Sequence, residues 1–235
     1  MAIRNYYNDI NKSAQEIFLN TIEEKDKLGY CHHISAFFFE FSECIQDKNE
    51  KNMMRTVSIQ LDTATINVTY GLYRQAISSL RLAFELALGV IHFSVNKLEH
   101  AEWILGKNDI KWSKLIDEEN GVLSVRFCNA FFHELNIHSH SYNSQAKELY
   151  REMSEYVHGN NDTWSKSGLS LKFNETLLNE YFSLFKKITE IMIFLICCRY
   201  LKSFERKQLD QLSTFLLEEM NHISAIREIL GGVKE

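Results

Sequence analysis

The sequence contains no proline, and only nine of its 235 residues are glycine. Proline interrupts helices and glycine destabilises them, so the scarcity of both favours long uninterrupted helices. The residues are 45% hydrophobic and 12% aromatic, which suffices for a substantial core in a chain of this length. The alternating pattern typical of strands is nearly absent. We therefore predict an all-α fold, an up-down bundle of long helices that forms a single domain over residues 1–235.

The chain has no excess of basic residues. Its formal net charge is −5 and its pI is near 6.0. Binding of duplex nucleic acid over a broad surface requires clustered lysine and arginine, so this balance argues against it. A small local basic patch is left open.

The sequence also lacks the features of secreted and membrane proteins. The amino terminus has no apolar signal-peptide core, and the most apolar run, residues 191–198, is too short to cross a bilayer. We expect that run to be a buried core helix of a soluble cytoplasmic protein, with no membrane partner. The cysteines are odd in number and mostly lie in apolar helical runs, which indicates buried reduced thiols: Cys31, Cys44, Cys128, Cys197 and Cys198.

No motif of a common metal or hydrolase site is present. Structural zinc requires paired ligands such as CxxC with a second pair, and neither the HxH of His138 and His140 nor the adjacent Cys197 and Cys198 has that spacing. A glycine-rich phosphate loop, GxSxG and HExxH are also missing. We therefore expect no metal and no cofactor, and conventional nucleotide hydrolases and serine hydrolases are unsupported.

Helical periodicity divides the chain. It predicts helices over residues 11–27, 52–69, 72–95, 147–158, 174–202 and 204–230. Residues 1–50 are interpreted as an N-terminal extension in which Gly29 ends the first helix. Residues 32–46 suit either a helix or an irregular or extended segment. The charged residues 47–51 are expected to form a solvated connection or the start of the next helix.

Two further segments interrupt the long helices. Residues 97–141 are predicted to be an insertion of short helices anchored by aromatic residues, and the polar residues 137–143 a loop. Residues 169–173 allow a short extended piece.

The apolar stripe of the last helix, 204–230, is expected to pack either inside the protomer or against a partner chain. Arg81 and Glu85, four residues apart, are expected to pair with each other, the alternative being contact with the face that carries Arg151 and His158.

The segment from residue 147 to 161, KELYREMSEYVHGNN, says most about function. Arg151 and His158 lie seven residues apart, nearly two helical turns, so they share one face with Ser154 and, at its edge, Glu155. The negative end of the helix dipole favours the imidazolium form of His158 and Arg151 disfavours it, which suits His158 to acid–base chemistry. Arginine is suited to holding a phosphate or the charge of a phosphorane.

Arg151 to His158 is R-x6-H, and it resembles the Rx4-6H pattern of HEPN domains. The sequences LYREMSEYVHG and SSLRLAFELALG are similar to the helical pairs of bacterial HEPN-like proteins. The resemblance, which covers residues 72–95 and 147–202, implies an all-α bundle found in toxins and phage-defence proteins. It implies a metal-independent ribonuclease whose sites are completed by two motifs facing each other across a homodimer.

The resemblance also implies roles for individual residues. His158 would be the general acid and base, Arg151 would stabilise the phosphorane, and Ser154 or Asn160 would orient the phosphate. Tyr150 and Asn160 would contact the substrate or support the site. The expected partners are RNA, a second copy of the chain, and an antitoxin or partner defence protein. The alternative is a non-catalytic helical interaction module that binds a partner effector, in which Arg151 and His158 are structural.

Overall fold

The computed structural model describes residues 2–159 and 171–233, which form helices and connections and contain no strand. The elements in chain order are α1 (Ala2–Thr21), α2 (Lys25–Cys44), α3 (Lys48–Thr69), α4 (Tyr73–Val95), α5 (Lys97–Ile104), α6 (Trp112–Leu115), α7 (Val125–Phe131), η1 (His133–Leu135), α8 (Asn136–His158), α10 (Glu175–Tyr200), η2 (Leu201–Ser203), α11 (Arg206–Met220) and α12 (Ser224–Ile229). The prediction of an all-α bundle is confirmed.

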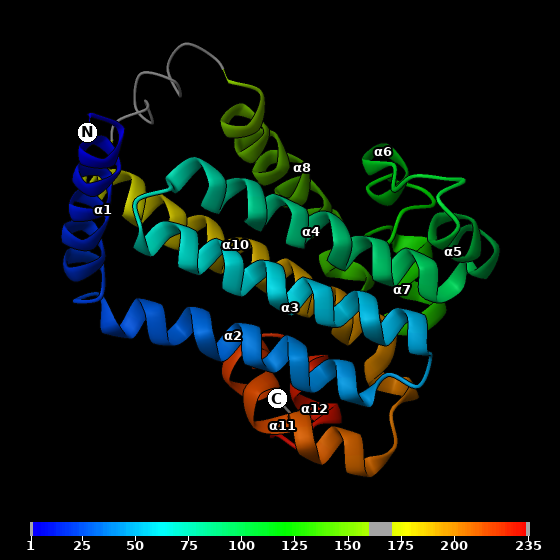
Figure 1. Cartoon of the computed structure of the whole chain (residues 1–235). Coiled ribbons are helices and arrows are strands. Elements are labelled where there is room, and N and C mark those ends of the chain that lie inside the picture. The colour runs from blue at the N-terminus through cyan, green and yellow to red at the C-terminus, as the bar shows by residue number, and fades with distance from the viewer. Residues whose placement is uncertain (1, 160–170, 234–235) are drawn as a thin grey trace.

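A bundle of long helices forms the body of the molecule. Figure 1 shows α2, α3, α4 and α10 running alongside one another, with α8 next to α4 and with α11 and α12 below α2. The turn between α3 and α4 contains Gly71 at a φ of 74°, in the left-handed region that favours glycine. A Cβ there would lie 2.8 Å from Cδ1 of Ile17, so this glycine also allows α1 to approach the turn.

The core is centred on α4 and α10. All residues from 191 to 198 are buried, as the sequence predicted for this apolar run. Among the described helices, α4 is the one long and apolar enough to cross a membrane. However, 72% of its most apolar window is buried inside the bundle, as in the core helix of a globular protein. Asn174 caps α10 as predicted, because its side chain accepts a hydrogen bond from the backbone N–H of Leu177.

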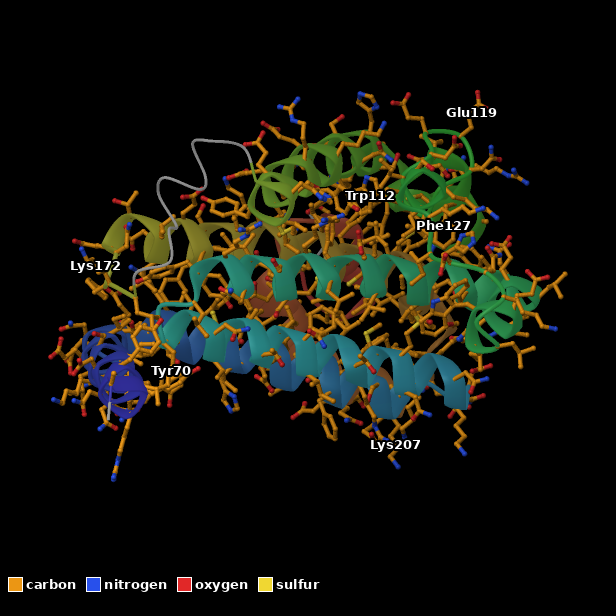
Figure 2. The ribbon with its side chains drawn as sticks, turned by 45° about the horizontal axis from the view of Figure 1, so that its top comes forward. Tyr70, Trp112, Glu119, Phe127, Lys172 and Lys207 are labelled. Carbon is orange, nitrogen blue, oxygen red and sulfur yellow. The ribbon has the colours of Figure 1, made fainter. Side chains whose placement is uncertain are left out.

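The N-terminal residues differ from the sequence-based expectation. The first helix, α1, begins at Ala2 and ends at Thr21, while Gly29 lies inside α2; the prediction that Gly29 ends the first helix was wrong. Residues 32–44 are helical, which decides between the two interpretations of that stretch. The C-terminal end of α1 packs on the bundle through Phe18, whose ring stacks on Tyr70 at 5.3 Å; Figure 2 labels Tyr70 at this end of the molecule.

The predicted insertion is a set of short elements, α5, α6, α7 and η1, at the other end of the bundle (Figure 1). Its aromatic residues pack on or within the core, as predicted: Trp103, Trp112, Phe127, Phe131 and Phe132. The predicted loop at residues 137–143 is wrong, because α8 already begins at Asn136. Tyr142 and Asn143 are buried there, and the Asn143 side-chain amide donates to the Ile116 carbonyl oxygen at 3.1 Å.

The C-terminal helix predicted over 204–230 is two helices, α11 and α12, with a break between Met220 and Ser224. Their apolar stripe packs inside the protomer, which decides between the two alternatives. The ring of Phe215 on α11 stacks on that of Phe37 on α2 with centroids 3.8 Å apart. The other buried residues of the stripe are Leu212, Leu216, Met220, Ile223 and Ile226.

Candidate functional site on helix α8

Helix α8 carries the residues of the predicted motif. Its inner face is buried through Leu149, Met153 and Tyr156, and the opposite face is exposed at Arg151 and His158. The helix ends at Gly159, as predicted, where a φ of 72° reverses the chain and the glycine N–H donates to the Glu155 carbonyl oxygen. The last turn therefore has a fixed geometry, and its orientation follows from the packed inner face.

Arg151 and His158 are both exposed on the outer face of α8. Neither forms a hydrogen bond or ion pair with another residue in the ranges 2–159 and 171–233. Seven residues of α-helix correspond to a rise of about 10 Å, a gap that two extended side chains span with one phosphate group between them. The sequence-based expectation that both residues share one accessible face agrees with this arrangement.

Ser154 lies between these two residues and is half-buried. Its hydroxyl donates to the Tyr150 carbonyl oxygen one turn earlier, at 2.6 Å. This bond occupies the one proton that the hydroxyl can donate, so Ser154 must give it up before it can bind a phosphate oxygen.

Tyr150 belongs to a network with α4 and α6. Its hydroxyl bonds to Nη2 of Arg81 at 2.5 Å and to Oε1 of Glu85, and its ring stacks on Trp112 at 3.7 Å. Arg81 and Glu85 also pair at 3.2 Å, as the sequence predicted. Burial and the hydrogen bond to Glu85 raise the pKa of Tyr150, while Arg81 opposes the shift. The tyrosine is therefore a neutral phenol that joins α8 to α4, and its hydroxyl is already engaged.

Arg81 shows how tightly this network is packed. The guanidinium carbon lies 4.4 Å from the centre of the Tyr150 ring, so a cation–π contact adds to the hydrogen bond. Its Nε is buried and has no hydrogen-bond partner among the described residues. A buried donor without a partner is costly, and the pairing of the same guanidinium with Glu85 and Tyr150 offsets that cost. Arg81 thus makes the predicted pair with Glu85 and also contacts α8, but it does so at Tyr150 and not at the exposed face of Arg151 and His158.

An acidic edge lies beside the exposed face. The Tyr156 hydroxyl donates to Oε1 of Glu180 on α10. Burial raises the pKa of Tyr156, and the hydrogen bond to Glu180 raises it further. Burial raises the pKa of Glu152, and the charge of Glu180 raises it further. These carboxyl groups make the side of α8 that faces α10 acidic, with Lys187 as a nearby opposing charge.

Asn160, the remaining predicted site residue, lies outside the described residues. The structure therefore places Arg151, His158 and Ser154 on one face of α8 and engages Tyr150 with α4 and α6. Within the described ranges, no group of three or more histidine, cysteine, aspartate or glutamate side chains is arranged to hold a metal ion.

A buried charged cluster that the sequence did not predict lies at the other end of the bundle. Glu50, within the segment expected to be a solvated connection or a helix start, is 4% exposed and lies in the first turn of α3. It accepts hydrogen bonds from the Tyr200 hydroxyl at 2.9 Å and from Lys97, which also binds Asp47 at 3.1 Å. A cavity of about 290 Å³ adjoins Glu50 and Tyr200. One sequence signal was available, the Asp47 cap that makes Glu50 the third residue of a helix.

A larger cavity, about 610 Å³, lies between the start of α8 and α12. His138 and His222 line it, together with Lys202, which pairs with Glu134 at 2.5 Å. Burial and the charge of His222 lower the pKa of His138. The histidines that line this cavity are not those of the predicted motif, so it is separate from the candidate site.

Comparison of the chain with models of known protein families, with curated proteins and with solved structures finds no match.

Proposed function

We propose that this protein is a metal-independent endoribonuclease of the HEPN-like type, with Arg151 and His158 as its catalytic pair. The observation that carries the proposal is the exposure of both side chains on one face of α8, without a partner among the described residues. A structural arginine and histidine are usually engaged by neighbouring carboxylates or carbonyls, whereas a pair that binds substrate must be free to reach it.

The reaction follows from the chemistry of the two groups. The neutral imidazole of His158 takes the proton from a ribose 2′-hydroxyl, and the resulting oxygen attacks the adjacent phosphorus. The guanidinium of Arg151 stabilises the negative charge that develops on the phosphorane oxygens. The 5′-oxygen of the next nucleotide leaves and takes a proton from an imidazolium. The products are a 2′,3′-cyclic phosphate and a 5′-hydroxyl.

A homodimer would supply the second acid–base group, because His158 of a second copy can hold the proton that the leaving oxygen needs. In this proposal the protein acts in the cytoplasm as the RNA-cleaving effector of a toxin or anti-phage system. An antitoxin or a partner defence protein would restrain it until infection or stress.

The experiment is cleavage of total RNA or purified tRNA by the purified protein, in buffer with EDTA. The variants are Arg151→Ala and His158→Ala, and the matched control is His140→Ala, an exposed histidine of the same helix outside the motif. Loss of His158 should lower the cleavage rate at least about 100-fold, as expected for an acid–base residue. His140→Ala should cleave like the wild type, and toxicity on expression should follow the same order.

If the wild type and both motif variants behave alike, the enzyme proposal fails. The alternative of a helical module that binds a partner effector then takes its place.

A further inference from the structure

Two of the five cysteines face each other in the core. The Sγ atoms of Cys128 on α7 and Cys198 on α10 are 3.6 Å apart. The two residues are 0% and 1% exposed, and all five cysteines are free thiols. Cys197, the neighbour of Cys198, is equally buried but shows no sulfur contact in the described part of the chain. The pairing is thus specific to one position on α7 and one on α10.

We infer that Cys128 and Cys198 are a site of oxidative modification, at which hydrogen peroxide produces a disulfide that crosslinks α7 to α10. A disulfide requires the two sulfur atoms to be about 2.05 Å apart, so they must approach by about 1.5 Å. Rotation about the side-chain bonds and a small shift of α7 provide this movement. Helix α7 has seven residues, from Val125 to Phe131, and is preceded by an irregular connection over residues 116–124.

The local hydrogen bonding assigns the order of events. The Cys198 thiol donates to Sγ of Cys128 and stabilises a thiolate there, which lowers the pKa of Cys128 although burial opposes the shift. The Cys128 thiolate attacks one oxygen of the peroxide, and the O–O bond breaks. Hydroxide is the leaving group, and Cys128 becomes a sulfenic acid. The sulfur of Cys198 then attacks that sulfenic acid, loses its proton, and displaces the hydroxyl group as water. Two thiols and one peroxide give one disulfide and two waters.

The position of Cys128 and Cys198 determines both the rate of their oxidation and the effect of the crosslink on the fold. Because both sulfurs are shielded from solvent, the oxidant reaches them when α7 opens locally, and the reaction is slower than that of an exposed thiol. Arg199, next to Cys198, already contacts α7 through its guanidinium, 4.6 Å from the centre of the Phe131 ring. The crosslink would make this contact permanent. Because α7 leads through η1 into α8, it would also fix the start of the helix that carries Arg151 and His158.

The test uses the full-length protein, treated with hydrogen peroxide and then denatured and alkylated with N-ethylmaleimide. Peptide mapping without reductant should show one crosslinked peptide that joins Cys128 to Cys198, with the other three cysteines alkylated. The midpoint of thermal unfolding should rise by about 5 °C, because the crosslink closes a long loop, and should return to its starting value after dithiothreitol.

Cys128→Ala and Cys197→Ala are the matched variants, since each removes one buried thiol. Cys197→Ala should still form the crosslink and gain thermal stability on oxidation. Cys128→Ala should form no crosslink and gain none. Each variant is compared with its own reduced form, so a general loss of stability does not affect the result. Five alkylated cysteines after treatment, oxidation that stops at sulfinic acid, or a crosslink between other cysteines would overturn the inference.

Discussion

The phenol ring of Tyr150 on α8 lies flat on the indole of Trp112 on α6, with centroids 3.7 Å apart and an angle of 8° between the ring planes. Figure 2 shows Trp112 where the insertion meets α4 and α8. Because Tyr150 is adjacent to Arg151 in the chain, this contact and the Arg81 network set the position of the exposed motif. The candidate site therefore depends on an insertion that lies outside the long helices.

Tyr150→Phe should retain the stacking and lose the hydroxyl. Glu85 and the partly unsatisfied Arg81 then each lose a partner, so we expect unfolding free energy to fall by about 1 to 2 kcal/mol in urea denaturation. Tyr142→Phe is the control, because it removes a single hydroxyl bond, to Glu190 at 3.1 Å, and should cost about 1 kcal/mol or less. A Tyr150→Phe protein as stable as the wild type would show that the network contributes nothing.

Lys97→Met should reveal the cost of leaving Glu50 without its cation. The Glu50 carboxylate is nearly inaccessible to solvent, so we expect the variant to lose about 1 to 3 kcal/mol in chemical denaturation at pH 7. The double variant Lys97→Met/Glu50→Gln removes the buried charge as well and should recover part of the loss. Equal stability of the single variant and the double variant would contradict this account of the cluster.

Glu152→Gln should stabilise the protein at neutral pH. Burial and Glu180 raise the pKa of Glu152, so the folded protein holds this proton to a higher pH than the unfolded chain does. Ionisation of Glu152 therefore lowers stability as pH rises above about 4. We expect a gain of about 0.5 kcal/mol at pH 7 for this partly solvated group, and none below pH about 4. Thermal unfolding at both pH values checks this, with Glu119→Gln, an exposed carboxyl group elsewhere on the surface, as control. A gain in stability that is larger at low pH than at pH 7 would contradict this prediction.

Phe215→Ala should release the C-terminal helices from α2. The lost ring packs flat on Phe37 and is buried, so we expect a loss of about 3 kcal/mol, with faster hydrogen exchange in α11 and α12 than in α4. Leu217→Ala, a change on the less buried side of α11, should cost less. Uniform exchange across all helices would indicate that α11 and α12 do not unfold as a separate unit.

The long helices could be predicted from sequence because their apolar pattern is continuous. The pattern of α3, α4 and α10 gave their bounds to within a few residues. The apolar pattern did not predict helices correctly where the burial of a residue depends on partners far away in the sequence. The polar start of α8 resembles a loop, yet Tyr142 is buried against Phe194 of α10 and Asn143 against the insertion at Ile116. Gly29 was expected to end a helix, but a single glycine costs only about 1 kcal/mol, which the packing of α2 outweighs.

The candidate site was predictable only in part, for the same reason. Helical geometry alone places Arg151 and His158 on one face. The sequence allowed a contact between Arg81 and this helix but did not identify Tyr150 as its partner, because the stacking of Tyr150 on Trp112 of α6 depends on the insertion. The bond from Ser154 to the Tyr150 carbonyl oxygen was not predicted either. The burial of Glu50 required knowledge of Tyr200, 150 residues away in the chain.

The most direct test is the rate at which purified wild-type protein and His158→Ala cleave tRNA in the presence of EDTA. The account predicts metal-independent cleavage to cyclic phosphate ends by the wild type, and a rate at least about 100-fold lower for a His158→Ala protein of unchanged thermal stability. Equal rates for the two proteins, or no cleavage by either, would contradict it.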